Sequence, residues 1–186
     1  FQFRMVENKL GLRVEDRLPY DHQNYLARID SEHREAVIQS EKEPSLFVLL
    51  QTWLERTPFV QSSGFSFWQN YRKAVDEMLR IDENGIKNNP YLNEAGKTTQ
   101  LAQLQKTRDS YETIHSEEKL KQVIDQKNWR LSHKATQAAL FILLYRDEPA
   151  LQLPYKIISL ITDIDENFTI WRYRHTQMAL RSEEHT

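Results

Sequence analysis

Apolar residues recur at helical spacing along nearly all of this chain, and the residues that interrupt helices are few. Four glycines and six prolines are distributed over 186 residues, and no segment alternates β-branched and polar residues as a half-buried strand does. Amphipathic helices bury their apolar faces by packing against one another. The pattern therefore predicts an all-α fold, a helical bundle.

Turn-forming residues set the ends of the expected helices. Gly11 is a natural C-cap for the opening helix, Pro58 stops another, and Pro149 follows the most apolar one. We expect Asp163 and Asp165 to favour the N-terminus of a separate last helix through its dipole. The expected helices cover residues 1–10, 22–42, 45–56, 65–81 and 131–146, then one that starts at 154 and a last one within 163–181, with a loop at 57–65.

The middle of the chain is its most polar part. Residues 82–97 are rich in turn formers, and residues 98–126 read as a polar helical stretch with a sparse apolar stripe. Such a stretch can bury little apolar surface, so we expect about 82–128 to form a polar helical insertion or subdomain. The whole of 1–186 is otherwise predicted to be one domain.

Composition excludes several classes of function. The net charge is −2, which gives no electrostatic basis for binding nucleic acid or an acidic membrane surface. The longest apolar run, 138–145, is far too short to cross a bilayer, and FQFRMVENK lacks the apolar core of a signal peptide. The absence of cysteine excludes disulfides and iron–sulfur clusters and fits a cytoplasmic protein.

One histidine lies on an apolar stripe of the last expected helix. Because a buried imidazole without a partner is unfavourable, the residue predicts either a metal partner or a hydrogen-bonding carbonyl. A haem iron is the metal partner that suits a single imidazole on an apolar surface. The spacing i, i+4, i+7, i+11, i+14 places on this face Ile164, Phe168, Trp171, His175 and Met178.

No other residue forms a recognisable reactive constellation. The chain has no Gly-rich phosphate loop, no HExxH and no GxSxG. His133 follows Ser132 in the first turn of a helix, where we expect a capping role. Carboxylate pairs such as Glu117 and Glu118 are expected at solvated helix ends. The histidines in polar segments, which we expect at the surface, are His22, His33, His115 and His185.

Several strings resemble the tryptophan 2,3-dioxygenase family in collinear order. They are FQFRMVENKLG (1–11), LERTP (54–58), GFSFW (64–68), RLSHKATQAALFILLYRDEP (130–149), LPYKIISLITDID (153–165) and WRYRH (171–175). The resemblance covers nearly the whole chain and is broken mainly between Ile81 and Trp129. Indoleamine 2,3-dioxygenase performs the same chemistry on a related fold, but these strings favour the tryptophan-specific family.

The resemblance implies an all-helical, cytoplasmic haem enzyme, an oxidoreductase of tryptophan catabolism. The family inserts both atoms of O₂ into L-tryptophan to give N-formyl-L-kynurenine, the first step of the kynurenine pathway, and it forms a homotetramer that is a dimer of dimers. By resemblance, His175 is the proximal axial ligand of the haem b iron. Trp171, one turn earlier, is expected near the porphyrin edge, and Phe3 takes a family position close to haem and substrate. Arg172 and Arg174 are expected to reach a propionate or to pair with nearby acids.

The chain also departs from the family pattern, and it looks truncated at both ends. The family's distal histidine, the arginine that binds the substrate carboxylate and the Gly–Thr–Gly–Gly–Ser–Ser–Gly loop have no match here, so no catalytic residue is assigned. We therefore expect that these residues alone do not turn over tryptophan. The alternative to an enzyme fragment is a truncated, non-catalytic helical protein that binds haem or serves as an assembly partner; a scaffold that has lost haem is a third possibility.

Overall fold

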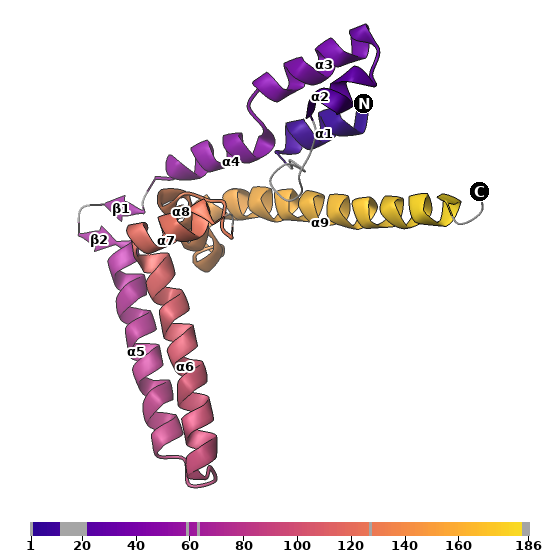
Figure 1. Cartoon of the computed structure of the whole chain (residues 1–186). Helices are drawn as coiled ribbons and strands as arrows, with labels where there is room; N and C mark the ends of the chain where they lie inside the picture. The colour runs from indigo at the N-terminus through magenta and orange to yellow at the C-terminus, as the bar shows by residue number, and fades with distance from the viewer. Residues whose placement is uncertain (1, 12–21, 59, 63, 127, 184–186) are drawn as a thin grey trace. The chain divides into compact units, whose positions relative to one another are not determined.

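The computed structural model describes residues 2–11, 22–58, 60–62, 64–126 and 128–183, and these lie almost entirely in helices (Figure 1). The predicted all-α class is confirmed. The elements are α1 (Gln2–Leu10), α2 (His22–Ala27), α3 (Ser31–Lys42), α4 (Leu46–Glu55), β1 (Gln61–Ser62), β2 (Phe65–Ser66), α5 (Phe67–Lys87), α6 (Glu94–His115), α7 (Glu117–Asp125), α8 (His133–Leu144) and α9 (Pro149–Glu183).

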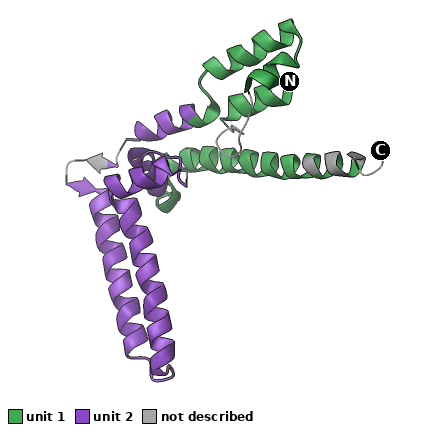
Figure 2. Ribbon diagram, viewed as in Figure 1, with its two compact units in different colours: residues 1–15, 19–47, 142–186 green, residues 16–18, 48–141 purple. Residues whose placement is uncertain are grey.

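The chain divides into two compact units (Figure 2). Unit 1 comprises residues 1–15, 19–47 and 142–186, and unit 2 comprises residues 16–18 and 48–141. The single domain and the insertion at about 82–128 stay predictions. Within the described residues, no helix is both long enough and apolar enough to cross a membrane.

Unit 1 is built around the packing of α1 on α3 (Figure 1). The amide of Asn8 donates to Ser40 Oγ at 2.9 Å, and both side chains are buried. The helix predicted over 22–42 is two helices, because the Asp30 side chain accepts from the His33 backbone N–H and caps the start of α3. That hydrogen bond is the main cause that lowers the pKa of Asp30.

Unit 2 contains α5 and α6, which lie side by side (Figure 1). Few of their described residues are buried: α5 buries Phe67, Val75 and Leu79, whereas none in α6 is buried. Both bounds of the turn-rich segment predicted over 82–97 are wrong. Since the residues beyond Ile81 continue the helix and Asn93 caps the next one, only 88–93 connect the two helices.

Two further boundaries in unit 2 differ from the predictions. The polar stretch predicted over 98–126 is broken at Ser116, whose side chain accepts from the Lys119 N–H and caps α7. The loop predicted over 57–65 contains the antiparallel pair β1–β2. Gly64, at φ +85°, allows the tight reversal between them.

The last two predicted helices are one continuous helix, α9. Pro149 occupies its first position, where a missing N–H is tolerated. Pro154 lies inside the helix without ending it, and no glycine or proline follows before Glu183. The prediction that Asp163 and Asp165 begin a separate helix is therefore wrong, because both lie in the middle of α9.

Candidate functional site

Helices α1 and α9 of unit 1 bring three aromatic side chains and one imidazole onto a common face. Phe168, Trp171 and His175 follow one another along α9, and the Trp171 and His175 rings stack with centroids 4.9 Å apart and planes 7° apart. Phe3 of α1 lies over this row, with its centroid 4.2 Å from that of Trp171, 5.1 Å from Phe168 and 6.5 Å from His175. The structure thus brings Phe3 together with Trp171 and His175, which lie far from it in sequence.

This aromatic face is partly open to solvent. Phe3 and Phe168 are half-buried, whereas His175 is exposed and Trp171 retains 43% of its accessible surface. Met178, one turn beyond, retains 60%. The result is a partly exposed apolar surface beside an accessible imidazole.

A buried ionic network joins the same two helices. Glu7 of α1 is 3% exposed and Arg4 is 5% exposed, with Arg4 Nη1 3.3 Å from Glu7 Oε2. Arg172 Nε of α9 lies 3.5 Å from Glu7 Oε1. Of the two roles expected for Arg172, the structure has the pairing with an acid. Arg174 is exposed.

The donor set fits a metal that is held mainly by a macrocycle. Among the described residues, no group of three or more His, Cys, Asp or Glu side chains is placed to hold a bare metal ion. A haem needs one axial imidazole and apolar surface for its ring. His175, stacked on Trp171 with Phe3 beside it, offers both.

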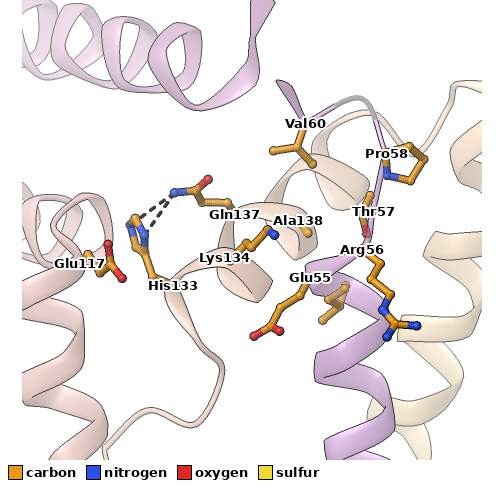
Figure 3. A pocket seen from close by; sticks show the side chains of 11 residues that line it. Glu55, Arg56, Thr57, Pro58, Val60, Glu117, His133, Lys134, Gln137 and Ala138 are labelled. Atoms are coloured by element: carbon orange, nitrogen blue, oxygen red, sulfur yellow. Dashed lines mark hydrogen bonds between the residues drawn. The ribbon is translucent and has the colours of Figure 1, made fainter. Parts of the chain in front are cut away.

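Unit 2 holds a separate cavity of about 470 Å³. Figure 3 shows the side chains that line it. The side-chain amide nitrogen of Gln137 lies 3.3 Å from Nδ1 and 3.5 Å from Nε2 of the His133 ring. Ser132, not His133, caps α8: its Oγ accepts from the Ala135 N–H at 3.2 Å. The lining residues are Leu54, Glu55, Arg56, Thr57, Pro58, Val60, Glu117, His133, Lys134, Gln137 and Ala138, so none of the predicted cofactor-binding residues borders this cavity.

Sequence comparison assigns the family. A model of the tryptophan 2,3-dioxygenase family matches residues 1–182. The chain belongs to this family. Proteins named tryptophan 2,3-dioxygenase are 41% identical over 181 residues in Bdellovibrio bacteriovorus and 39% identical over 180 residues in Dictyostelium discoideum, each alignment covering 97% of this chain. These alignments cover 50% and 45% of the relatives, so the chain spans about half their length.

The match to the tryptophan 2,3-dioxygenase family includes both helices of the aromatic face. Sequence reasoning on that face missed Glu7, although Glu7 stands four residues after Phe3 and therefore one turn along the same side of α1. An acid at that spacing from an aromatic is the signal that could have identified the acidic partner of Arg172.

The expectation of a surface position is wrong for His115. Both of its ring nitrogens are buried and lack a hydrogen-bond partner, because the ring packs against Trp68 (centroids 4.6 Å apart) and Tyr71 (5.5 Å). Burial is the main cause that lowers the pKa of His115, and Arg72 adds to it. His22 and His33 are partly exposed and lie next to Glu41 and Asp30 respectively; His185 lies outside the described residues.

Proposed function

We propose that this chain is the part of a haem-dependent tryptophan 2,3-dioxygenase that holds the proximal face of the haem. The observation that carries the proposal is the convergence of Phe3, Trp171 and His175 on one half-open face, in a chain of that family. The reaction proposed for the whole protein converts L-tryptophan and O₂ into N-formyl-L-kynurenine in the kynurenine pathway.

The residues of the face have two proposed roles, an axial ligand and an apolar packing surface. His175 supplies the axial imidazole for the iron of haem b, and its exposed ring is accessible for that bond. Trp171 and Phe3 offer the apolar surface that packs against the macrocycle and keeps water from it. When bound, haem supplies O₂ binding and the redox chemistry of the reaction. Exposed Arg174 is better placed than Arg172 to meet a propionate, because Arg172 is already paired with Glu7.

The wider proposal follows the family. We propose a cytoplasmic protein that works as a homotetramer, a dimer of dimers, with L-tryptophan and O₂ as its substrates and with 1–186 part of a single domain. The relatives' names support the substrates. Because no residue here matches the family's distal histidine or its substrate-binding arginine, we expect these 186 residues alone to bind haem without producing N-formyl-L-kynurenine.

The deciding experiment is an absorption spectrum after haem reconstitution. The chain should show the reduced-state Soret band of histidine-ligated iron, and His175→Ala should lose it. His33→Ala is the matched control, because His33 belongs to the same unit, is partly exposed and pairs with Asp30 at the start of α3.

The outcomes test three separate points: the role of His175, haem binding by the chain, and its expected inactivity. A Soret band that survives in His175→Ala would contradict the role of His175. A wild-type chain that shows no band would favour a scaffold without haem. N-formyl-L-kynurenine formed by these residues alone would contradict the expected inactivity.

A further inference from the structure

We infer that Glu7 is a positioning residue for His175. This inference rests on the proposed function, since Glu7 would orient the His175 imidazole toward the haem iron. Glu7 does not touch His175; it acts by fixing α1 against α9, and through the aromatic stack it sets the orientation of the imidazole ring.

The geometry gives α1 and α9 two neighbouring points of attachment. The first is apolar: the Phe3 ring lies over Trp171 with centroids 4.2 Å apart. The second is ionic: Arg172 Nε lies 3.5 Å from Glu7 Oε1. Phe3 and Glu7 are one turn apart on α1, and Trp171 and Arg172 are adjacent on α9. A stack alone allows the helices to slide or roll. An ion pair one turn away along α1 adds a second attachment, at a buried oxygen, Glu7 Oε1, that is otherwise unbonded among the described residues, and so restricts their register.

The burial of Glu7 argues for a role beyond stability. A carboxylate that is 3% exposed has lost most of its hydration. Ion pairs in such places are often replaceable by apolar residues without loss of stability, and their best-attested use is to specify one arrangement over others. Here Glu7 pairs with Arg4 of its own helix and with Arg172 of α9. A change of register between α1 and α9 would therefore move Arg172 away from Glu7.

The fixed register reaches His175 through Trp171. Their rings are nearly parallel, 7° apart, and the Phe3 centroid lies 6.5 Å from that of His175. His175 itself is exposed, and its ring contacts among the described residues are those with Trp171 and Phe3. A partner that orients a metal ligand typically changes metal affinity by roughly 10- to 100-fold when it is removed.

The first test measures haem affinity in two backgrounds. In the full chain, Glu7→Gln should raise the haem dissociation constant by roughly tenfold, at the low end of the range for outer-shell partners. In His175→Gly supplied with free imidazole, where the ligand no longer depends on α9, Glu7→Gln should have no effect. Equal losses in both backgrounds would overturn the inference, because they would indicate a general defect of the fold.

A second test needs no haem. In the wild-type NMR spectrum, the His175 ring protons should be shifted by the ring current of Trp171, and Glu7→Gln should move them toward the position of an unstacked histidine. Arg172→Gln serves as the second variant if Glu7→Gln does not fold, and it should give the same change. Unchanged His175 resonances in both variants would overturn the positioning role, whereas failure of the wild-type chain to bind haem would overturn the proposed function instead.

Discussion

Replacing Gly11 should directly disturb the packing of the C-terminal end of α1. It ends that helix at φ +82°, and its N–H donates to the Glu7 carbonyl at 2.9 Å. A Cβ at this position would lie 2.6 Å from Ser45 Oγ and 2.9 Å from Phe47 Cβ. Gly11→Ala therefore combines a strained backbone with a steric clash in unit 1.

The two terms can be estimated separately. The left-handed conformation costs a non-glycine residue about 1–2 kcal/mol. Inserting a methyl group into space that neighbouring side chains already fill costs about 1–3 kcal/mol. Since Phe47 Cβ is joined directly to the backbone and cannot rotate away, we expect Gly11→Ala to lower the free energy of unfolding by about 2–5 kcal/mol in total.

Two other glycines provide matched controls. Gly64 has φ +85° but nothing within 4 Å of its Cβ position, so Gly64→Ala should lose only the backbone term, about 1–2 kcal/mol. Gly85 lies inside α5, also with open space around it, and Gly85→Ala should gain up to about 1 kcal/mol of helix propensity.

Urea unfolding followed by far-ultraviolet circular dichroism measures the series. The expected order of stability is Gly85→Ala, wild type, Gly64→Ala, Gly11→Ala. If Gly11→Ala is no less stable than Gly64→Ala, the reasoning from the Ser45 and Phe47 contacts is refuted.

Three further predictions concern unit 2. Burial lowers the pKa of His115 below that of an unfolded histidine, so unfolding takes up a proton at mildly acidic pH. The melting temperature should therefore fall as the pH drops from about 6.5 toward the lower folded pKa. His115→Phe should abolish this pH dependence of the melting temperature. Ser132→Ala removes the cap of α8 and a 2.5 Å hydrogen bond to Glu55, and should cost about 1–2 kcal/mol in urea unfolding, with a loss under about 0.3 kcal/mol contradicting the cap. Leu79→Ala, at a site 1% exposed, should cost about 2–5 kcal/mol in the same assay, whereas replacing the exposed Met78 should change little.

Much of the fold followed from local chemistry. The helical periods gave the class, and Gly11 and Pro149 marked real boundaries because one permits a left-handed residue and the other suits a first turn. Three of the wrong helix boundaries came from side-chain caps. Asp30, Asn93 and Ser116 each begin a helix by accepting a backbone N–H, and such caps were overlooked inside polar stretches that read as continuous helix or as turn.

The candidate site was predictable only in part. The stripe that carries Trp171 and His175 is visible in the sequence because it is local to one helix. The pairing of that stripe with Phe3, and of Arg172 with Glu7, joins residues more than 160 positions apart, and no local pattern specifies such a contact. The burial of His115 was missed for the same reason, since its polar neighbours in sequence do not reveal Trp68 across the α5–α6 contact.

The α5–α6 pair has a consequence for how the length of this chain can vary. Its two helices meet through few buried side chains and end at a tip where Tyr91 is 95% exposed. Removing or adding seven residues in each helix shifts both by about two turns, which keeps the facing stripes in register. The hairpin can therefore grow or shrink from its tip without changing any residue of unit 1, and we expect insertions, deletions or a grafted peptide to be tolerated there.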